Sequence, residues 1–210
     1  MILKKFDKTK LILIIVPIII FAFLAISIYA GYSTNFETWV YNGSVYHMND
    51  TLNKVIIAIT NFGGPITISI FCLLLLAYSK TRKKVGIPVS IAIVVSEILN
   101  IILKNIFARQ RPNILQVIEE TSYSFPSGHS MINATIYTML AILAIKYIKN
   151  KKIKISVVIL CFLIPLLIGF TRIYLGVHYV TDVIGGLLLG FAVSVIVYTL
   201  LKKDNTEFVS

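Results

Sequence analysis

Charged residues are scarce in this 210-residue chain, at 14% of the total against 57% hydrophobic residues. A water-soluble domain usually carries about a quarter charged residues, and the mean hydropathy here is +0.87. Acidic residues are scarcer still, with nine Asp and Glu against 20 Lys and Arg. The scarcity of charge excludes an ordinary soluble domain, and the net charge of +11 points to nucleic acid or an anionic surface as a partner.

Cysteine is nearly absent as well. Cys72 and Cys161 both lie inside long apolar runs, so no disulfide framework is predicted. Free cysteines in such surroundings behave as small hydrophobic residues. We therefore expect both to be buried and structural.

Long apolar runs dominate what is present. A helix needs about 20 mostly apolar residues to cross a hydrocarbon layer of about 30 Å, where no water satisfies the backbone. Six runs meet or nearly meet this length, at approximately 11–30, 61–78, 85–107, 130–148, 153–170 and 180–201. The sequence therefore predicts an all-α fold, a six-transmembrane-helix bundle that forms a single membrane domain over residues 1–210. The first run is longer than the core of a signal peptide and is expected to be retained.

The basic residues predict the orientation of this bundle. Lys and Arg in short loops stay on the cytoplasmic side. All but five of the 20 fall on one side of the six-span arrangement, in the N-terminus, the turns at 80–84 and 146–154, and the C-terminal tail. Both termini of this multi-pass cell-membrane protein are therefore predicted to be cytoplasmic. Because topology explains most of the +11, nucleic acid is excluded as a partner and anionic lipid headgroups are expected.

Residues 31–60 are predicted to form a long outer loop. The loop carries five of the aromatic residues: Tyr32, Phe36, Trp39, Tyr41 and Tyr46. Amphipathic rings favour the headgroup level of a bilayer, so we expect them to anchor the loop, with substrate guidance as the alternative. His47 lacks polar company in the sequence and is expected to be an ordinary loop histidine.

Three polar segments are predicted to open on the face opposite the basic turns. They cover residues 104–112, 124–130 and 171–182. Lys104, Arg111 and Arg172 offer positive charges, and guanidinium forks match phosphate oxygens. The turn at Ser127 and Gly128 offers free N–H groups at a helix N-terminus, which favour an anion. These features predict a site that binds a phosphoryl group.

Two histidines supply the reactive groups for such a site. His178 and Asp182 are four residues apart, so the carboxylate can hold the imidazole in one tautomer and raise its basicity. A neutral imidazole nitrogen can then attack phosphorus, while His129, beside the anion seat, can protonate the leaving oxygen. The nearby cations would repel a divalent ion. No metal and no other cofactor are therefore expected.

The motif Lys104-x6-Arg111-Pro112, Pro126-Ser127-Gly128-His129, Arg172-x5-His178-x3-Asp182 resembles the three-part signature of the type 2 phosphatidic acid phosphatase superfamily. That superfamily includes bacterial undecaprenyl-diphosphate and phosphatidylglycerophosphate phosphatases. The resemblance implies a metal-independent phosphatase in which His178 forms a phosphohistidine, Asp182 orients it and His129 is the acid. It also implies phosphate binding by Lys104, Arg111, Ser127, Gly128 and Arg172. The third segment begins Thr171-Arg172, where the family often has Ser-Arg.

A lipid substrate could stay in the bilayer while its headgroup reaches the cations. We therefore expect hydrolysis of a lipid phosphate or diphosphate, of the undecaprenyl diphosphate or phosphatidylglycerophosphate type, at the extracytoplasmic face. The alternatives are a phosphotransferase or a phosphatase of soluble esters on the same site, and a transporter or binding protein for anionic lipids. Transporters commonly carry their polar sites at the midplane, whereas these polar segments lie near one face.

Polar and small residues inside the spans complete the expectations. The third span carries four polar residues on one helical face: Ser96, Glu97, Asn100 and Lys104. Carboxylates inside a span usually face the bundle with a partner, so an interhelical clamp is expected, with support for Lys104 or the floor of the site as the alternative. Three glycines are expected to allow close helix packing rather than catalysis: Gly185, Gly186 and Gly190.

Overall fold

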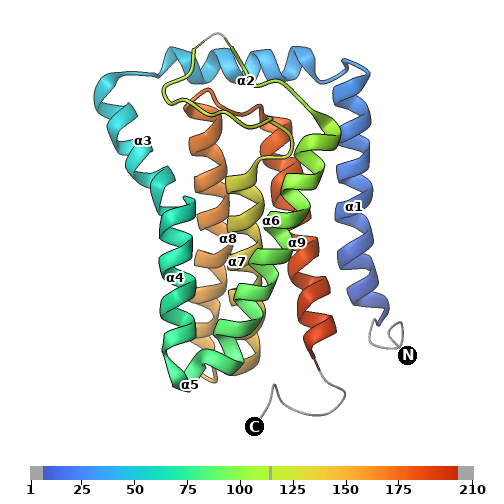
Figure 1. Ribbon diagram of the computed structural model, residues 1–210, viewed down its shortest axis with the longest axis vertical. Coiled ribbons are helices and arrows are strands. Elements are labelled where there is room, and N and C mark those ends of the chain that lie inside the picture. Colours follow the sequence, from blue (N-terminus) through green and yellow to red (C-terminus); the bar gives the residue numbers. More distant parts are fainter. Residues whose placement is uncertain (1–6, 114, 203–210) are drawn as a thin grey trace.

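The computed structural model describes residues 7–113 and 115–202, and these residues form helices and connecting segments without strands. The helices are α1 (Lys8–Tyr29), α2 (Thr34–Tyr46), α3 (Asp50–Phe62), α4 (Pro65–Ala77), α5 (Ser79–Thr81), α6 (Ile87–Phe107), α7 (Gly128–Tyr147), α8 (Lys151–Tyr174) and α9 (Val180–Leu201), with a π-helical turn at Arg82–Gly86 before α6. Six stretches of helix are long and apolar enough to span a membrane. The bundle is upright in Figure 1, with α2 lying across one end. The predicted all-α, six-span architecture is confirmed.

Local sequence explains where several helices begin. Asp7, Asn49 and Asn150 precede α1, α3 and α8, and each side chain accepts a hydrogen bond from the first turn. Such caps satisfy N–H groups that have no partner within the helix. Pro65 occupies the first turn of α4, where its missing N–H costs nothing.

The predicted outer loop at 31–60 is wrong, because α2 and most of α3 lie there. In Figure 1, α2 covers the top of the bundle and α3 descends from it into α4. The second span is accordingly longer than predicted and covers Asp50–Ala77. Both helices mix polar and apolar residues, so a search for continuous apolar runs does not detect them.

The aromatic residues of α2 and of the turn before it differ in exposure. Tyr32, Trp39 and Tyr46 are 83%, 73% and 85% exposed, in keeping with the expected anchoring. Tyr41 is buried instead. Its hydroxyl donates to the carbonyl of Leu115 at 2.8 Å and accepts from the N–H of Leu115 at 2.7 Å. Tyr41 therefore ties α2 to the loop between α6 and α7, and the expectation that it anchors the chain at the headgroups is wrong.

Helix α9 packs closely on α7 and α1 at the centre of the bundle. A methyl group on Gly186 would lie 2.6 Å from the carbonyl oxygen of Ser127, and one on Gly185 would lie 2.8 Å from the ring of Phe125. Gly190 likewise abuts the backbone of Met131. The three glycines are therefore close-packing positions, as expected.

The basic turns share one end of the bundle. In Figure 1, α1 starts and α9 stops at the end where α4 connects to α6 and α7 connects to α8. The turns at 80–84 and 146–154 thus lie together, away from α2. Lys4, Lys5 and Lys203 lie outside the described residues. The membrane side that this end faces stays a prediction.

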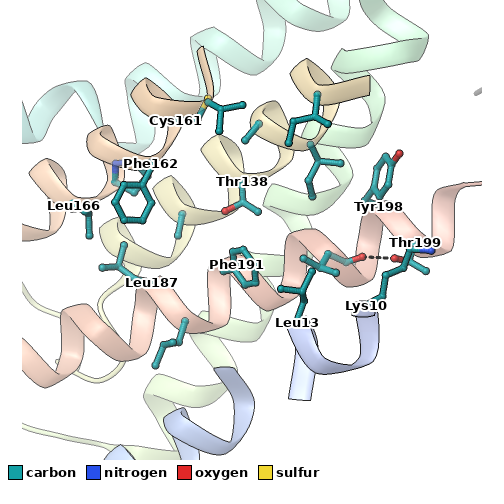
Figure 2. Close-up of a pocket in the computed structure, with 18 residues that line it drawn as sticks. Lys10, Leu13, Thr138, Cys161, Phe162, Leu166, Leu187, Phe191, Tyr198 and Thr199 are labelled. Atoms are coloured by element: carbon teal, nitrogen blue, oxygen red, sulfur yellow. Dashed lines mark hydrogen bonds between the residues drawn. The ribbon is translucent and has the colours of Figure 1, made fainter. Parts of the chain in front are cut away.

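A cavity of about 500 Å³ lies between α1, α7, α8 and α9, and Figure 2 shows its lining. Phe162, Leu187 and Phe191 are among the apolar side chains around it, and Lys10 is the charged residue among those that line it. Cys161, also in this lining, is a free buried cysteine, and Cys72 is free and half-buried. The cavity matches the chemistry of lipid tails and lacks the converging charges of a phosphate site.

Candidate active site

The three polar segments meet at the end of the bundle that α2 covers. A second cavity, of about 260 Å³, lies there. Five of the eight predicted site residues line it: Lys104, Arg111, Gly128, His129 and His178. The other three, Ser127, Arg172 and Asp182, are almost completely buried and contact the lining residues or their neighbours. The sequence segments therefore come together as predicted.

His178 lies in the turn between α8 and α9, just before α9 rather than on its first helical turn. Its Nδ1 atom is 3.4 Å from Oδ2 of Asp182 and 3.3 Å from Oγ of Ser124. The same carboxylate oxygen accepts the Tyr179 N–H at 2.9 Å and the Ser124 hydroxyl at 2.5 Å. This network assigns the imidazole proton to Nδ1, which leaves Nε2 with its lone pair.

The surroundings of His178 keep its imidazole neutral. Burial is the largest cause and lowers the pKa of His178 to about 3, although the hydrogen bond and the charge of Asp182 act in the opposite direction. The charges of Arg111 and Arg172 lower the pKa of His178 further. At neutral pH, Nε2 is therefore unprotonated and able to act as a nucleophile.

The free nitrogen of His178 faces a cation. Nη1 of Arg111 lies 3.1 Å from Nε2 of His178 and 2.8 Å from the carbonyl oxygen of Val177. The loop from α6 to α7 holds the cations by its oxygens, since Arg111 Nε donates to the Ser122 carbonyl at 2.7 Å and Lys104 donates to the Ser122 hydroxyl at 3.2 Å. A positive charge therefore stands beside Nε2 of His178, at the wall of the cavity.

Glu120 is a site residue that the sequence reasoning missed. Its carboxylate pairs with the Arg172 guanidinium and lies 3.7 Å from Nη2 of Arg111. Burial alone would raise the pKa of Glu120, but Arg172 and Arg111 outweigh it and the pKa is lowered. Glu120 is therefore an ionised internal anion shared by the two arginines. The only sequence signal is its place in the short stretch between two motif segments.

Arg172 is buried at 1% exposure and only partly satisfied. Besides Glu120, it donates from Nη1 to the Thr60 hydroxyl of α3 at 3.2 Å. Its Nε–H has no hydrogen-bond partner among the described residues. A buried donor without a partner is costly, so this guanidinium retains capacity for an additional acceptor.

The start of α7 offers fewer free N–H groups to an anion than the sequence predicts. The Ser127 N–H donates to the carbonyl of Asp182 at 3.0 Å, and the Ser127 hydroxyl caps the helix through Ser130. These bonds use the polar groups of Ser127 within the protein. Within the described residues, the N–H groups of Gly128 and His129 have no such partners. They remain at the positive end of α7, where an anion is favoured.

The polar face of α6 has three separate roles. The Ser96 hydroxyl accepts from Thr135 of α7 at 2.9 Å, which makes the expected clamp. Asn100 donates to the carbonyl of Pro126 at 3.2 Å and so supports the turn before α7. Glu97 is exposed in the cavity lining. It belongs to the floor of the site, and the clamp interpretation is wrong for this residue.

A neutral imidazole nitrogen, a ring of cations and free helix N–H groups around one cavity are the parts of a phosphoryl-transfer site. The six-span bundle that carries them defines an integral membrane enzyme of that class. The chain belongs to the PAP2 superfamily, whose profile matches residues 85–206, and it is a phosphatase of that superfamily.

Individual relatives agree with this assignment. The chain is 33% identical to phosphatidylglycerophosphatase B of Bacillus subtilis, over 83% of this chain and 89% of that protein. It is 30% identical to the undecaprenyl-diphosphatase of Sulfolobus acidocaldarius, over 84% of this chain and 86% of the relative. Its fold is similar to the crystal structure of a transmembrane PAP2-type phosphatidylglycerolphosphate phosphatase from Bacillus subtilis, with a TM-score of 0.82, 30% identity, and coverage of 89% of this chain and 94% of that one.

Proposed function

We propose that this protein hydrolyses the terminal phosphate of a lipid phosphate or diphosphate through a phosphohistidine intermediate, without a metal ion. The observation that carries the proposal is the Nε2 atom of His178, which lies 3.1 Å from Nη1 of Arg111 in a cavity that His129 also lines. The names of the relatives favour undecaprenyl diphosphate or phosphatidylglycerophosphate as the substrate.

The geometry supports a two-step mechanism. The phosphoryl oxygens bind Lys104, Arg111 and the N–H groups at the start of α7, which draws Arg111 away from His178. Nε2 of His178 then attacks phosphorus, the bond to the leaving oxygen breaks, and His129 gives that oxygen a proton. His129 next takes a proton from water, whose oxygen attacks phosphorus and releases phosphate from His178.

The buried carboxylate keeps the nucleophile aligned through both steps. Asp182 accepts the Nδ1–H of His178 and stabilises the positive charge that the ring gains when Nε2 bonds to phosphorus. Glu120 competes with the phosphate for Arg172, so substrate binding includes an exchange of one anion for another.

A lipid substrate fits the apolar half of the cavity. Pro65 and Ile68 of α4, Ile101 of α6 and Ile132 of α7 line it beside the cations. Ile101 is 51% exposed, so apolar surface is accessible beside the cations. A tail can therefore lie among apolar side chains while the phosphate reaches the charged wall.

Phosphate release from purified protein tests the proposal. We expect release from lipid phosphates in the presence of a chelator, and its loss in His178→Ala. His47→Ala is the matched control, because His47 is exposed at the end of α2 and should be dispensable. Binding of lipid phosphates without release would instead support an anionic-lipid transporter or binding protein, and transfer to an added alcohol in preference to water would support a phosphotransferase.

The extracytoplasmic location of the site is part of the proposal and has a separate test. Cationic turns face the cytoplasm in most membrane proteins, and here they lie at the end of the bundle opposite the cavity. An impermeant maleimide should label Lys54→Cys, in the first turns of α3, in intact cells. It should label Lys149→Cys, in the turn between α7 and α8, only after permeabilisation. The reverse pattern would place the site inside.

A further inference from the structure

A chain of buried charges links α2 to the active site. Nη2 of Arg109 lies 2.7 Å from Oε2 of Glu37, and Nη1 of Arg109 lies 2.5 Å from Oδ1 of Asp182. Glu37 is 5% exposed and Asp182 is fully buried. Arg109 and Glu37 are 72 positions apart in the sequence. Glu37 lies outside the motif that resembles the superfamily signature, and Arg109 occupies one of its unspecified positions between Lys104 and Arg111.

The start of α9 holds this bridge by further contacts. Nη1 of Arg109 also donates to the Thr181 hydroxyl at 2.9 Å, and that hydroxyl donates to Glu37. The guanidinium lies over the ring of Tyr179, 4.1 Å from its centre. A planar fork with several donors suits such a set of partners, and a single ammonium does not.

We propose that Arg109 and Glu37 are positioning residues for phosphoryl transfer, acting on His178 through Asp182. The inference rests on the proposed function of His178 as nucleophile. Arg109 holds Oδ1 of Asp182, which leaves Oδ2 for the Nδ1–H of His178, the Ser124 hydroxyl and the Tyr179 N–H. Two arginines of one loop thus flank the catalytic pair, Arg111 beside Nε2 of His178 and Arg109 on the far side of Asp182.

The backbone places Arg109 for this contact. Helix α6 ends at Phe107, and the residue after it, Ala108, adopts a left-handed conformation with φ of 45°. The carbonyl of Arg109 then accepts the Ser124 N–H at 2.8 Å. These two features turn the chain toward α9 and join the two ends of the loop that carries the phosphate-binding cations.

Electrostatics gives Arg109 a second effect on the nucleophile. Its charge offsets that of Asp182, so the carboxylate orients the imidazole while raising its basicity less than an isolated carboxylate would. The charged groups with the largest effect on the pKa of His178 are Asp182, Arg111 and Arg172, and Arg109 acts on that pKa through its ion pair with Asp182. Loss of Arg109 should therefore raise the pKa of His178 and move the acid limb of the activity profile to higher pH.

Substitutions with matched controls separate positioning from folding. Arg109→Gln should lower kcat about 100-fold, the loss that a 1 Å misplacement can produce, with KM within about threefold of wild type. Arg109→Lys keeps the charge but cannot bridge both carboxylates, and should lose about tenfold. Glu37→Gln should also lose about tenfold. Lys54→Gln and Glu119→Gln, at exposed positions, are the controls and should match wild type.

The experiment measures kcat and KM from pH 2.5 to 9 for each variant, a range that includes the acid limb set by the His178 pKa of about 3, with thermal melts in detergent across the range to confirm folding. The expected result is the stated order of kcat losses, together with an acid limb shifted upward in Arg109→Gln and not in Glu37→Gln. A wild-type kcat in Arg109→Gln, or an equal loss at every pH, would overturn the inference. If the melting temperature of Arg109→Gln is well below that of the wild type, the kcat losses of Arg109→Lys and Glu37→Gln test the inference instead, and wild-type kcat in both would overturn it. Wild-type protein without phosphatase activity would instead overturn the proposed function.

Discussion

The two ends of the bundle use positive charge in different ways. At the end that holds both described termini, Arg82, Lys84 and Lys149 are exposed side chains in short turns. At the other end, Lys104 and Arg172 are buried and donate to defined oxygens of the protein. Exposed cations contribute little to stability, whereas buried ones are strongly unfavourable unless they are paired. An excess of exposed cations at one end therefore predicts the orientation of the bundle in the membrane, whereas buried, hydrogen-bonded cations mark a candidate anion-binding site.

The ion-paired cluster at the site end is also unbalanced in charge, and it does not include Glu97, which is exposed in the cavity lining. Four cations, Lys104, Arg109, Arg111 and Arg172, meet three carboxylates, Glu37, Glu120 and Asp182. The excess positive charge and the partnerless Nε–H of Arg172 both favour an additional anion. The exposed end has no comparable cluster of buried ionic groups within the described residues.

After the complete loss of phosphate release in His178→Ala, the largest expected effect of a single change at the site end is that of replacing His129. His129→Ala should lower turnover of an alkyl lipid monophosphate by about 100- to 10,000-fold, because general acid catalysis typically contributes that much. An aryl phosphate with an acidic leaving group should lose far less, because it departs without a proton. Steady-state rates on the two substrates test this, and equal losses on both would contradict the acid role.

Arg172 and Arg82 provide a direct comparison of the two ends. Arg172→Ala should lower kcat/KM about 100-fold or more, as loss of a donor to the transition state does. Arg82→Ala, which removes the same side chain from an exposed turn, should leave kcat/KM unchanged. Comparable losses in the two variants would mean that the effect is structural.

Replacing Glu120 should have a smaller effect, and it should strengthen anion binding where the loss of Arg172 weakens it. Glu120→Gln removes the internal anion from Arg172 and Arg111, so inorganic phosphate should inhibit about tenfold more strongly, a change of about 1.4 kcal/mol. Because the pKa of Glu120 is lowered, mild acidification of the wild-type protein should not reproduce the change. Inhibition constants for inorganic phosphate, measured at several pH values, test this prediction. Unchanged or weaker inhibition in Glu120→Gln would contradict competition between Glu120 and phosphate for the arginines.

The smallest expected effect on catalysis comes from the exposed end. Replacing Arg82, Lys83 and Lys84 by Gln should change kcat less than about twofold, because exposed charges of this kind contribute little. The same replacement should increase the fraction of molecules inserted with α2 inside, because Lys and Arg in short loops favour the cytoplasmic side. Maleimide labelling of Lys54→Cys in intact cells would measure that fraction, and an unchanged fraction would show that other charges set the orientation.

The sequence was sufficient to predict six spans, although not the length of the second, and the convergence of the three motif segments. Apolar length marks a span independently of its neighbours, and the spacing of His178 and Asp182 is local. The helices α2 and α3 were missed because their polar residues interrupt any continuous apolar run. Ser127 was predicted to offer its N–H to an anion, but this N–H donates to the carbonyl of Asp182. Local spacing does not reveal that contact.

The partners of the cations could not be predicted for a similar reason. Glu37 contacts Arg109 across 72 positions, and Glu120 contacts Arg172 across 52. Such pairs are set by how α2 and the loop before α7 fold over the bundle. A sequence shows that buried cations need carboxylates, but it does not show which carboxylate each cation contacts.

The most direct test is to trap the covalent intermediate. Wild-type protein mixed with a ³²P-labelled lipid phosphate in chelator and quenched in base should retain label as an alkali-stable, acid-labile phosphoenzyme. Peptide mapping should place that label on His178, and His178→Ala should retain none. Label on another residue, or rapid phosphate release by the wild type with no labelled protein at any time, would contradict a nucleophilic His178.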